Sequence, residues 1–418
     1  MFNLTSNKDG YRRLLNSECS DSTGATEEWG IVLARGQGSS LWDVEGNEYV
    51  DLCGGFGSLS LGQNPDSILN VFSEYASRKD LLLQGMGDVF PSADKIQFIE
   101  KLSSVLPARF KRVSLALSGS GAVDIALKTA FQRKASTGMI CFEGGYHGLE
   151  LGVLPIAARE DFREPFVSWF NNSSVVRLPW ACSDQDIENA VYELQKNGTP
   201  LAAVIVEPIQ GRGGMRPAPK SWLSMLYDVT QREDALLIFD EVFVGAGRTG
   251  RFTWASEFDC DLICLGKALG GGVPIAVCAG TEAAMDHWPK DKPEAIHTGT
   301  YFGHPFSCRI ASVVVDEIVR NNLSGRSLVL GDKIQKLLAQ ELKSPLVREV
   351  RATGLFVGIE FTKAGLGEKV MIEGLKKKII TLPCGDGARV LSLTPALNID
   401  EGVLFSAVRE LALVINSI

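Results

Sequence analysis

Two stretches decide the fold that we expect: Leu236-Leu-Ile-Phe-Asp-Glu-Val242 and Leu262-Ile-Cys-Leu-Gly-Lys267. Each begins as a short apolar run, which is typical of a strand buried on both faces of a parallel sheet. The first run ends on the carboxylates of Asp240 and Glu241, and the second ends on the amine of Lys267. Because parallel strands end at the same edge of a sheet, we expect one carboxylate from the first run and the amine from the second run to lie close together.

An anion-binding turn is expected earlier in the chain. Arg112–Leu117 reads as another strand, Ser118-Gly-Ser-Gly121 as a tight turn, and Ala122–Lys134 as a helix with one apolar stripe. A helix that opens on Ser and Gly points free N–H groups and the positive end of its dipole toward an anion. The same order of elements could form a degenerate dinucleotide-binding motif, although Asp124 stands where the third glycine would be.

Two more predicted strands lead into side chains that could contact a cofactor or a substrate. Met139–Phe142 leads into Tyr146, whose ring can lie flat over a cofactor, and Ala202–Val206 leads into Glu207. A pyridoxal phosphate enzyme needs an amine that binds the cofactor covalently and a carboxylate that keeps its pyridine nitrogen protonated. The sequence therefore predicts an α/β enzyme with this cofactor at the carboxyl ends of its strands.

Composition narrows the class of protein. The 418 residues are 45% hydrophobic, which is enough to bury a large core, and they carry a net charge of −8. An acidic chain whose basic run is limited to Lys376–Lys378 is not expected to bind nucleic acid. The apolar runs are too short to span a membrane, and residues 1–10 lack the apolar stretch of a signal peptide, so we expect a cytoplasmic protein.

The cysteines and histidines give no sign of a metal site or of a disulfide framework. The nine cysteines are scattered without a Cys-x-x-Cys pair, and several lie in apolar runs, which fits a reducing cytoplasm. The four histidines have no metal-ligand spacing. We therefore expect no metal.

The alternation of elements predicts two domains. Residues 65–305 alternate strand and helix patterns, which indicates a mainly parallel central sheet covered on both faces, the larger, cofactor-binding domain. Residues 1–64 and 306–418 are expected to form a second, smaller α+β domain built from both chain ends. The first of these segments contains a predicted hairpin over residues 38–51, with its turn at Glu45-Gly-Asn47.

The ordered motifs resemble those of the class III aminotransferases, which have the fold-type I architecture of pyridoxal phosphate-dependent transferases. The matching stretches occur in family order and cover nearly the whole chain: Leu41–Gly46, Gln84–Pro91, Ser118–Gly121, Tyr146–Gly148, Glu207–Pro208, Asp240–Val242, Gly247–Gly250, Gly266–Lys267, Thr298–Pro305 and Gly354–Glu360. No single motif is decisive, but their number and order make a chance match improbable. The resemblance implies a transaminase that works through a Schiff base on Lys267 and a pyridoxamine phosphate intermediate.

The resemblance also implies three catalytic residues. Lys267 matches the Schiff-base lysine, which would also move a proton between the substrate carbon and the cofactor. Asp240 matches the acid on the pyridine nitrogen, and Glu207 matches an acid near the amino end of the substrate.

Further matches concern the binding of the cofactor. Val242 matches the side chain packed against the ring, and Tyr146 matches the aromatic residue stacked on it. Ser120 and Gly121 fall on the phosphate loop. Thr300 matches a threonine that reaches the phosphate held by the neighbouring subunit, so the resemblance implies a homodimer with shared active sites.

The sequence departs from its relatives where they bind a substrate carboxylate. Family members that use glutamate as donor resemble one another in an arginine after the Tyr-His-Gly stretch, where Leu149 stands here. Many carry another arginine near the carboxyl end, where Ser392 stands if Leu391–Leu397 is the matching run. We therefore expect an amine or ω-amino donor other than 4-aminobutyrate or ornithine. A different arginine would bind the 2-oxo acid acceptor, and the sequence does not rank the candidates Arg163, Arg212 and Arg389.

Two alternatives stay open from the sequence. A racemase or epimerase of the same fold would use the same lysine to deliver a proton to the opposite face of the substrate. A degenerate, non-enzymatic relative, or a nicotinamide-binding protein that uses the Ser118–Gly121 turn, belongs to another class of protein. A new keto product would favour the transaminase over the racemase, and a yellow protein would exclude the nicotinamide-binding alternative.

Overall fold

The computed structural model describes residues 4–20, 22–24, 29–87, 89–291 and 294–418, and its largest sheet has seven strands. They lie in the order β4 (Phe110–Ala116), β12 (Ala276–Thr281), β11 (Leu262–Leu265), β10 (Leu236–Asp240), β7 (Leu201–Val206), β5 (Gly138–Phe142) and β6 (Val175–Leu178). β12 runs antiparallel to β4 and β11, whereas the successive pairs from β11 to β6 are all parallel. The expected α/β fold with a mainly parallel sheet is confirmed.

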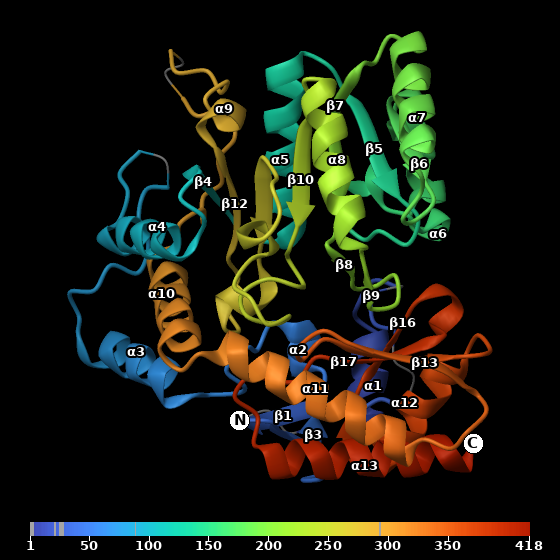
Figure 1. Cartoon of the computed structure of the whole chain (residues 1–418). Coiled ribbons are helices and arrows are strands. Elements are labelled where there is room, and N and C mark those ends of the chain that lie inside the picture. The colour runs from blue at the N-terminus through green and yellow to red at the C-terminus, as the bar shows by residue number, and fades with distance from the viewer. Residues whose placement is uncertain (1–3, 21, 25–28, 88, 292–293) are drawn as a thin grey trace.

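Helices cover both faces of this sheet because its strands are apolar on both sides. Along β10, Leu236 and Ile238 share a buried cluster with α5 (Gly119–Lys134), while Leu237 and Phe239 share another with α7 (Asp184–Lys196) and α8 (Lys220–Arg232). Figure 1 shows the sheet between α5 and the pair formed by α7 and α8. This two-sided burial leaves the strand ends as the accessible part of the sheet.

Strand β12 is not among the strands expected from the sequence. It pairs with β4 from Ala276↔Ala116 to Gly280↔Arg112. The strand is rich in Ala and Gly, which have low β propensity, so its pattern is weak when read locally. Its tertiary neighbours on both sides supply the missing stabilisation.

The two chain ends meet in a second sheet. β1 (Leu33–Gln37), β2 (Ser40–Asp43) and β3 (Glu48–Asp51) are antiparallel, and β15 (Ile379–Ile380) joins β3 in parallel. The expected hairpin turn lies between β2 and β3, with Gly46 at φ +86°, a left-handed value that glycine adopts readily. This pairing supports a smaller domain built from both ends, and its boundaries after residues 64 and 305 stay a prediction.

Most of the other elements lie below the large sheet in Figure 1. A third sheet has the strand order β13 (Val347–Ala352), β14 (Val357–Phe361), β17 (Val390–Leu393) and β16 (Leu382–Cys384). The helices near this third sheet are α1 (Asn7–Leu15), α11 (Leu323–Glu341), α12 (Leu366–Lys376) and α13 (Glu401–Ser417). A second group of helices lies beside the large sheet and consists of α3 (Asp66–Ser77), α4 (Ala93–Val105) and α10 (Pro305–Arg320).

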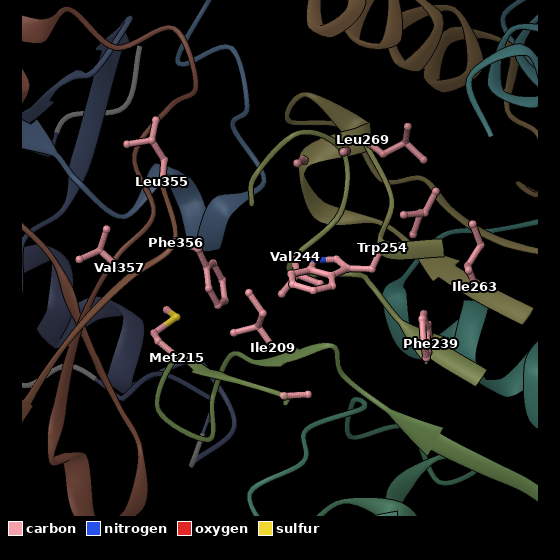
Figure 2. Packing of buried hydrophobic residues seen from close by; sticks show 14 of the residues in the cluster. Ile209, Met215, Phe239, Val244, Trp254, Ile263, Leu269, Leu355, Phe356 and Val357 are labelled. Carbon is pink, nitrogen blue, oxygen red and sulfur yellow. The ribbon is translucent and has the colours of Figure 1, made fainter. Parts of the chain in front are cut away.

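The buried core is continuous across the two parts. Figure 2 shows Phe356, which directly precedes β14, among Ile209, Val244 and Trp254 from the larger part. Because this cluster joins residues that are far apart in the sequence, the carboxyl-end edge of the large sheet is held firmly against the C-terminal segment.

Some expectations lie partly or wholly outside the described residues. These are the start of the N-terminal segment, residues 1–3, and Asp88 within the Gln84–Pro91 motif. In the described part of the chain, no helix is both long enough and apolar enough to cross a membrane. The same part contains no group of three or more His, Cys, Asp or Glu side chains arranged to hold a metal ion.

Candidate active site

A cavity of about 240 Å³ lies at the carboxyl-end edge of the large sheet. Its lining segments each follow the end of a strand, namely β4, β5, β7, β10 or β11, as expected for a ligand site in an open α/β sheet. The lining residues are Gly119, Ser120, Tyr146, His147, Gly148, Leu149, Glu207, Arg212, Asp240, Val242, Phe243 and Lys267. The structure thus brings together six of the expected site residues: Ser120, Tyr146, Glu207, Asp240, Val242 and Lys267.

Lys267 follows β11 directly and has an unusual backbone conformation. Its φ is +39°, a left-handed value that costs a non-glycine residue about 1–3 kcal/mol and is therefore a mark of functional positions. Burial lowers the pKa of the Lys267 amine, and the charge of Arg212 lowers it further, while Asp240 and Glu207 raise it. A lowered pKa increases the uncharged fraction of the amine, which is the form that acts as nucleophile or base.

Asp240 is the last residue of β10, and its side chain is fixed by two hydrogen bonds. Oδ2 lies 2.8 Å from Nδ1 of His147, and Oδ1 accepts the backbone N–H of Val242 at 3.1 Å. Both Asp240 and His147 are buried. The sequence analysis assigns no role to His147, which stands 93 residues away, and no local signal announces the contact. We infer that His147 orients the Asp240 carboxylate.

Glu241, the other carboxylate at this strand end, turns away from the cavity. It accepts hydrogen bonds from Thr253 Oγ1 at 2.6 Å and from the backbone N–H of Trp254 at 2.8 Å. Burial raises the pKa of Glu241 to about 7. Asp240 therefore lines the cavity and Glu241 does not, because successive residues of an extended chain point to opposite faces.

Glu207 connects two walls of the cavity. Its Oε1 accepts the backbone N–H of Tyr146, and its Oε2 accepts the backbone N–H of Gly211, both at 2.9 Å. The pKa of Glu207 is raised to about 7, mainly by burial. The nearby Asp240 charge also raises it, while His147 and the two backbone N–H groups lower it. These two hydrogen bonds fix the position of the loop after β5 relative to the loop after β7.

Phe243 forms a wall of the cavity that the sequence analysis does not single out. The Nζ atom of Lys267 lies 4.4 Å from the centroid of its ring, and the Phe356 ring packs edge-on against it with a centroid distance of 4.9 Å. Gly211 permits this arrangement, since a Cβ atom there would lie 2.5 Å from the Phe243 ring. In the sequence, Phe243 reads as one more residue of an apolar run, so its place in the site carries no local signal.

The first turn of α5 lies where the sequence predicts an anion-binding turn. Ser118 is the N-cap residue, and its Oγ accepts the N–H of Gly121 at 3.0 Å. A Cβ atom on Gly119 would lie 2.5 Å from Cγ1 of Val242, so glycine is needed for this close approach. Ser120 lines the cavity but Gly121 does not. The N–H groups of such a turn lack intrahelical partners and are suited to a phosphate.

Glu150 is bound to the serines of this turn. The hydroxyls of Ser118 and Ser120 both donate to Oε1 of Glu150, each at 2.7 Å. A carboxylate therefore competes with any other anion for the same two donors.

We expect the Glu150→Gln substitution to tighten the binding of a phosphate-bearing cofactor. Removing the charge at this exposed position removes a repulsion of about 1 kcal/mol, which corresponds to about a fivefold decrease in Kd. Fluorescence titration of the cofactor-free protein measures this constant, and Glu160→Gln, an exposed glutamate of α6 (Glu160–Arg163), is the matched control. An unchanged Kd in the Glu150 variant would mean that this side chain moves clear of the phosphate.

Most of the remaining candidate residues for binding the phosphate or a substrate carboxylate lie outside this cavity. Thr300 is exposed, and its carbonyl oxygen accepts the side-chain amide of Gln84 at 2.6 Å. Ser392 is buried in β17 and donates to the carbonyl oxygen of Leu382. Arg163 and Arg389 are not among the lining residues, whereas Arg212 is.

Comparison with known proteins identifies the family of the chain. The family model "Aminotransferase class-III" matches residues 23–415. The chain is 33% identical over 389 residues to an acetylornithine aminotransferase of Methanopyrus kandleri, covering 91% of this chain and 93% of that protein. It is 32% identical over 384 residues to a putrescine aminotransferase of Pectobacterium atrosepticum, covering 89% and 80%, respectively.

A solved structure shows the same fold. The ornithine aminotransferase of Toxoplasma gondii, in which pyridoxal phosphate is partially occupied, is similar with a TM-score of 0.85 and 24% identity, covering 99% of this chain and 96% of that one. The family match favours a transaminase over the nicotinamide-binding alternative, and it confirms the resemblance drawn from the motifs. The chain therefore belongs to the class III aminotransferases, the transaminases that use pyridoxal phosphate.

Proposed function

We propose that this transaminase moves an amino group from an amine or ω-amino compound to a 2-oxo acid, with Lys267, Asp240 and Glu207 as its central residues. One observation carries the proposal: the amine of Lys267, the carboxylate of Asp240 and the ring of Tyr146 line one cavity together with the first turn of α5. No other arrangement of functional groups in the described part of the chain combines an amine of lowered pKa with a buried acid and an anion-binding turn.

The cavity residues fit pyridoxal phosphate. Gly119 permits the close approach of Val242 at the cavity, and the buried Asp240 presents a negative charge that a protonated ring nitrogen would neutralise. When bound, the cofactor supplies an electron-withdrawing ring for the carbon at which the substrate reacts. The residues that would hold it are Lys267 by a covalent bond, Asp240 at the nitrogen, Val242 and Tyr146 at the ring, and Ser120 at the phosphate. Gly121, the other residue expected at the phosphate, has its N–H already bound to Ser118 Oγ.

The chain's own groups would handle the proton and exclude water. Nζ of Lys267 would take a proton from the substrate carbon and return it, because its lowered pKa keeps part of the amine uncharged. His147 would keep Asp240 aimed at the ring nitrogen through the 2.8 Å contact. The Phe243 ring, packed on Phe356, would shield the amine from solvent.

The donor class is supported by what the cavity lacks. Leu149 lines the cavity at the position where glutamate-using relatives carry an arginine, and an apolar side chain cannot bind a carboxylate there. Ser392 lies outside the cavity with its hydroxyl already bound to Leu382. The names of the relatives, putrescine and acetylornithine aminotransferase, fit a donor with an amino group on an alkyl chain.

A panel of donors and acceptors tests the function. The holoenzyme is incubated with diamines and ω-amino acids, each with pyruvate or 2-oxoglutarate, and the alanine or glutamate formed is quantified by chromatography. We expect an amine or ω-amino donor other than 4-aminobutyrate or ornithine to be turned over most efficiently. Efficient turnover of 4-aminobutyrate with 2-oxoglutarate, lost in Arg389→Ala, would overturn the donor assignment. Inversion of an amino acid without a keto product would select the racemase alternative.

We also propose that the protein is a homodimer with shared active sites. Two neighbouring segments, 82–90 and 296–301, expose large apolar side chains, which soluble monomers rarely gather in one place. They are linked by the hydrogen bond from Gln84 to Thr300, and the side chains that are more than half exposed are Leu83, Met86, Val89, Phe90, Ile296 and Tyr301. Thr300 belongs to this patch and not to its own cavity, so it would serve the phosphate of a partner.

We expect the Thr300→Val substitution to weaken cofactor retention. Loss of one hydrogen bond to a charged phosphate costs about 1.5–3 kcal/mol, which raises the Kd of the cofactor about 10-fold to 100-fold. Thr298→Val, on the same exposed loop, is the matched control. Equilibrium dialysis gives the constant, and sedimentation gives the oligomeric state of Thr300→Val and of Phe90→Asp. A fully active monomer, or equal cofactor affinity in the parent and Thr300→Val, would contradict shared sites.

A cytoplasmic location is part of the proposal. The nine cysteines, all within the described residues, are free, and eight of them are buried. Buried thiols that stay reduced are typical of proteins in a reducing compartment. Localisation of the tagged full chain by fractionation would test this point.

A further inference from the structure

We infer that Arg212 binds the carboxylate of the 2-oxo acid acceptor, and this inference rests on the proposed function. Arg212 lies in the loop between β8 (Ile209–Gln210) and β9 (Arg216–Pro217). Its guanidinium stands 5.4 Å from the centroid of the Tyr146 ring, and it lines the same cavity as Lys267. The cation therefore lies beside the ring of Tyr146 and lines the same cavity as the amine of Lys267.

The guanidinium of Arg212 has unused donors. Among the residues that the structure describes, none forms a hydrogen bond or an ion pair with its side chain, although it has five N–H groups. The neighbouring arginines are engaged: Arg216 donates to Gln210 and to the carbonyl oxygen of Glu143, and Arg351 pairs with Glu349 and Glu360. Arg212 is thus the cation of this region that is available to a ligand.

The backbone that carries Arg212 is held in place. Its carbonyl oxygen accepts the N–H of Gly385 at 2.8 Å, and the preceding Gly211 is bound to the buried Glu207. On the other side, Arg351 donates to the carbonyl oxygen of Gly214 at 2.6 Å. A free guanidinium on a fixed loop loses little backbone freedom when it binds a ligand, which favours affinity. Glu207 acts here as a positioning residue for Arg212.

The remaining arginine candidates do not reach the cavity. Arg163 ends α6, and its Nε is buried without a hydrogen-bond partner in the described chain. Arg389 precedes β17 and is likewise absent from the lining. The structure therefore separates the three arginines that the sequence leaves unranked, and only one of them shares the cavity with Lys267.

The chemistry of the acceptor identifies the ligand group. A 2-oxo acid carries a carboxylate next to the carbonyl carbon that receives the amino group, whereas an amine donor needs none. A planar guanidinium binds a carboxylate through two parallel hydrogen bonds, and the fixed geometry also orients the adjacent carbonyl. Arg212 should therefore matter for the acceptor half-reaction and little for an amine donor without a carboxylate.

The test compares acceptors with and without a carboxylate. Parent, Arg212→Gln and Arg212→Lys are reconstituted with pyridoxamine phosphate, which starts the acceptor half-reaction without any donor, and the spectral change is followed after mixing with pyruvate or with propanal. For pyruvate, we expect kcat/KM to fall about 10-fold to 100-fold in Arg212→Gln and less in Arg212→Lys. For propanal, we expect a change of no more than about threefold. Inhibition by propionate should weaken in parallel.

Control variants and contrary results make the inference falsifiable. Arg163→Gln and Arg389→Gln should keep the parental preference for pyruvate over propanal. A selective loss for pyruvate in Arg389→Gln, or an equal loss for both acceptors in Arg212→Gln, would overturn the assignment of Arg212. The acceptor half-reaction needs no amino donor. If the donor panel gave no turnover, the proposed donor class would be rejected, and the role of Arg212 could still be measured in the acceptor half-reaction.

Discussion

Replacing Lys267 by alanine is expected to abolish transamination and the yellow colour of the holoenzyme. In the proposed function the amine is both the covalent attachment point of the cofactor and the base at the substrate carbon, so one substitution would remove both functions. We expect kcat to fall at least about 10⁴-fold, which corresponds to about 5 kcal/mol of transition-state stabilisation. Steady-state assays and the visible spectrum measure the two losses.

The attachment point can also be identified directly. Borohydride reduction of the parent holoenzyme followed by proteolysis and mass spectrometry should place the cofactor on the peptide that contains Lys267. Lys111→Ala, an exposed lysine of β4, is the matched control and should keep both colour and activity. Transamination retained by the Lys267 variant, or label on another lysine, would refute the assignment.

Replacing Asp240 by alanine is expected to decrease turnover about 10³-fold or more while some cofactor stays bound. Without the carboxylate the ring nitrogen loses its proton, and the ring no longer withdraws electrons effectively. The other residues proposed to hold the phosphate and the ring, Ser120, Tyr146, Val242 and Lys267, are kept in this variant, so binding should suffer less than catalysis. Single-turnover kinetics with spectrophotometric determination of bound cofactor separates these effects.

The adjacent Glu241 provides a control for this experiment. Glu241→Gln alters a carboxylate one position along the chain that is bound to Thr253 and Trp254 and does not line the cavity. We expect this variant to lower the melting temperature but to stay active once folded. If Asp240→Ala remained within about tenfold of the parent, Asp240 would not be the partner of the ring nitrogen.

Much of the fold could be predicted because its signals are local. The apolar runs that become β5, β7, β10 and β11 are short, continuous and bounded by polar residues, which is the pattern of strands buried on both faces. The start of α7 (Asp184–Lys196) also has a local signal, because Ser183 and Asp186 form a capping box there. By contrast, β12 depends on strands that flank it in space, so its small residues gave no sufficient local signal.

The sequence by itself determined which side chains stand at the strand ends, because an apolar run followed by Asp240 or Lys267 is a local pattern. Only the tertiary structure decided which of them face the cavity. Asp240 and Glu241 are adjacent, and alternation along a strand sends them to opposite sides, but the pattern does not say which side holds the site. The contact of His147 with Asp240 and the choice of Arg212 among three arginines are likewise spatial facts, since loops far apart in the sequence meet only when the sheet has formed.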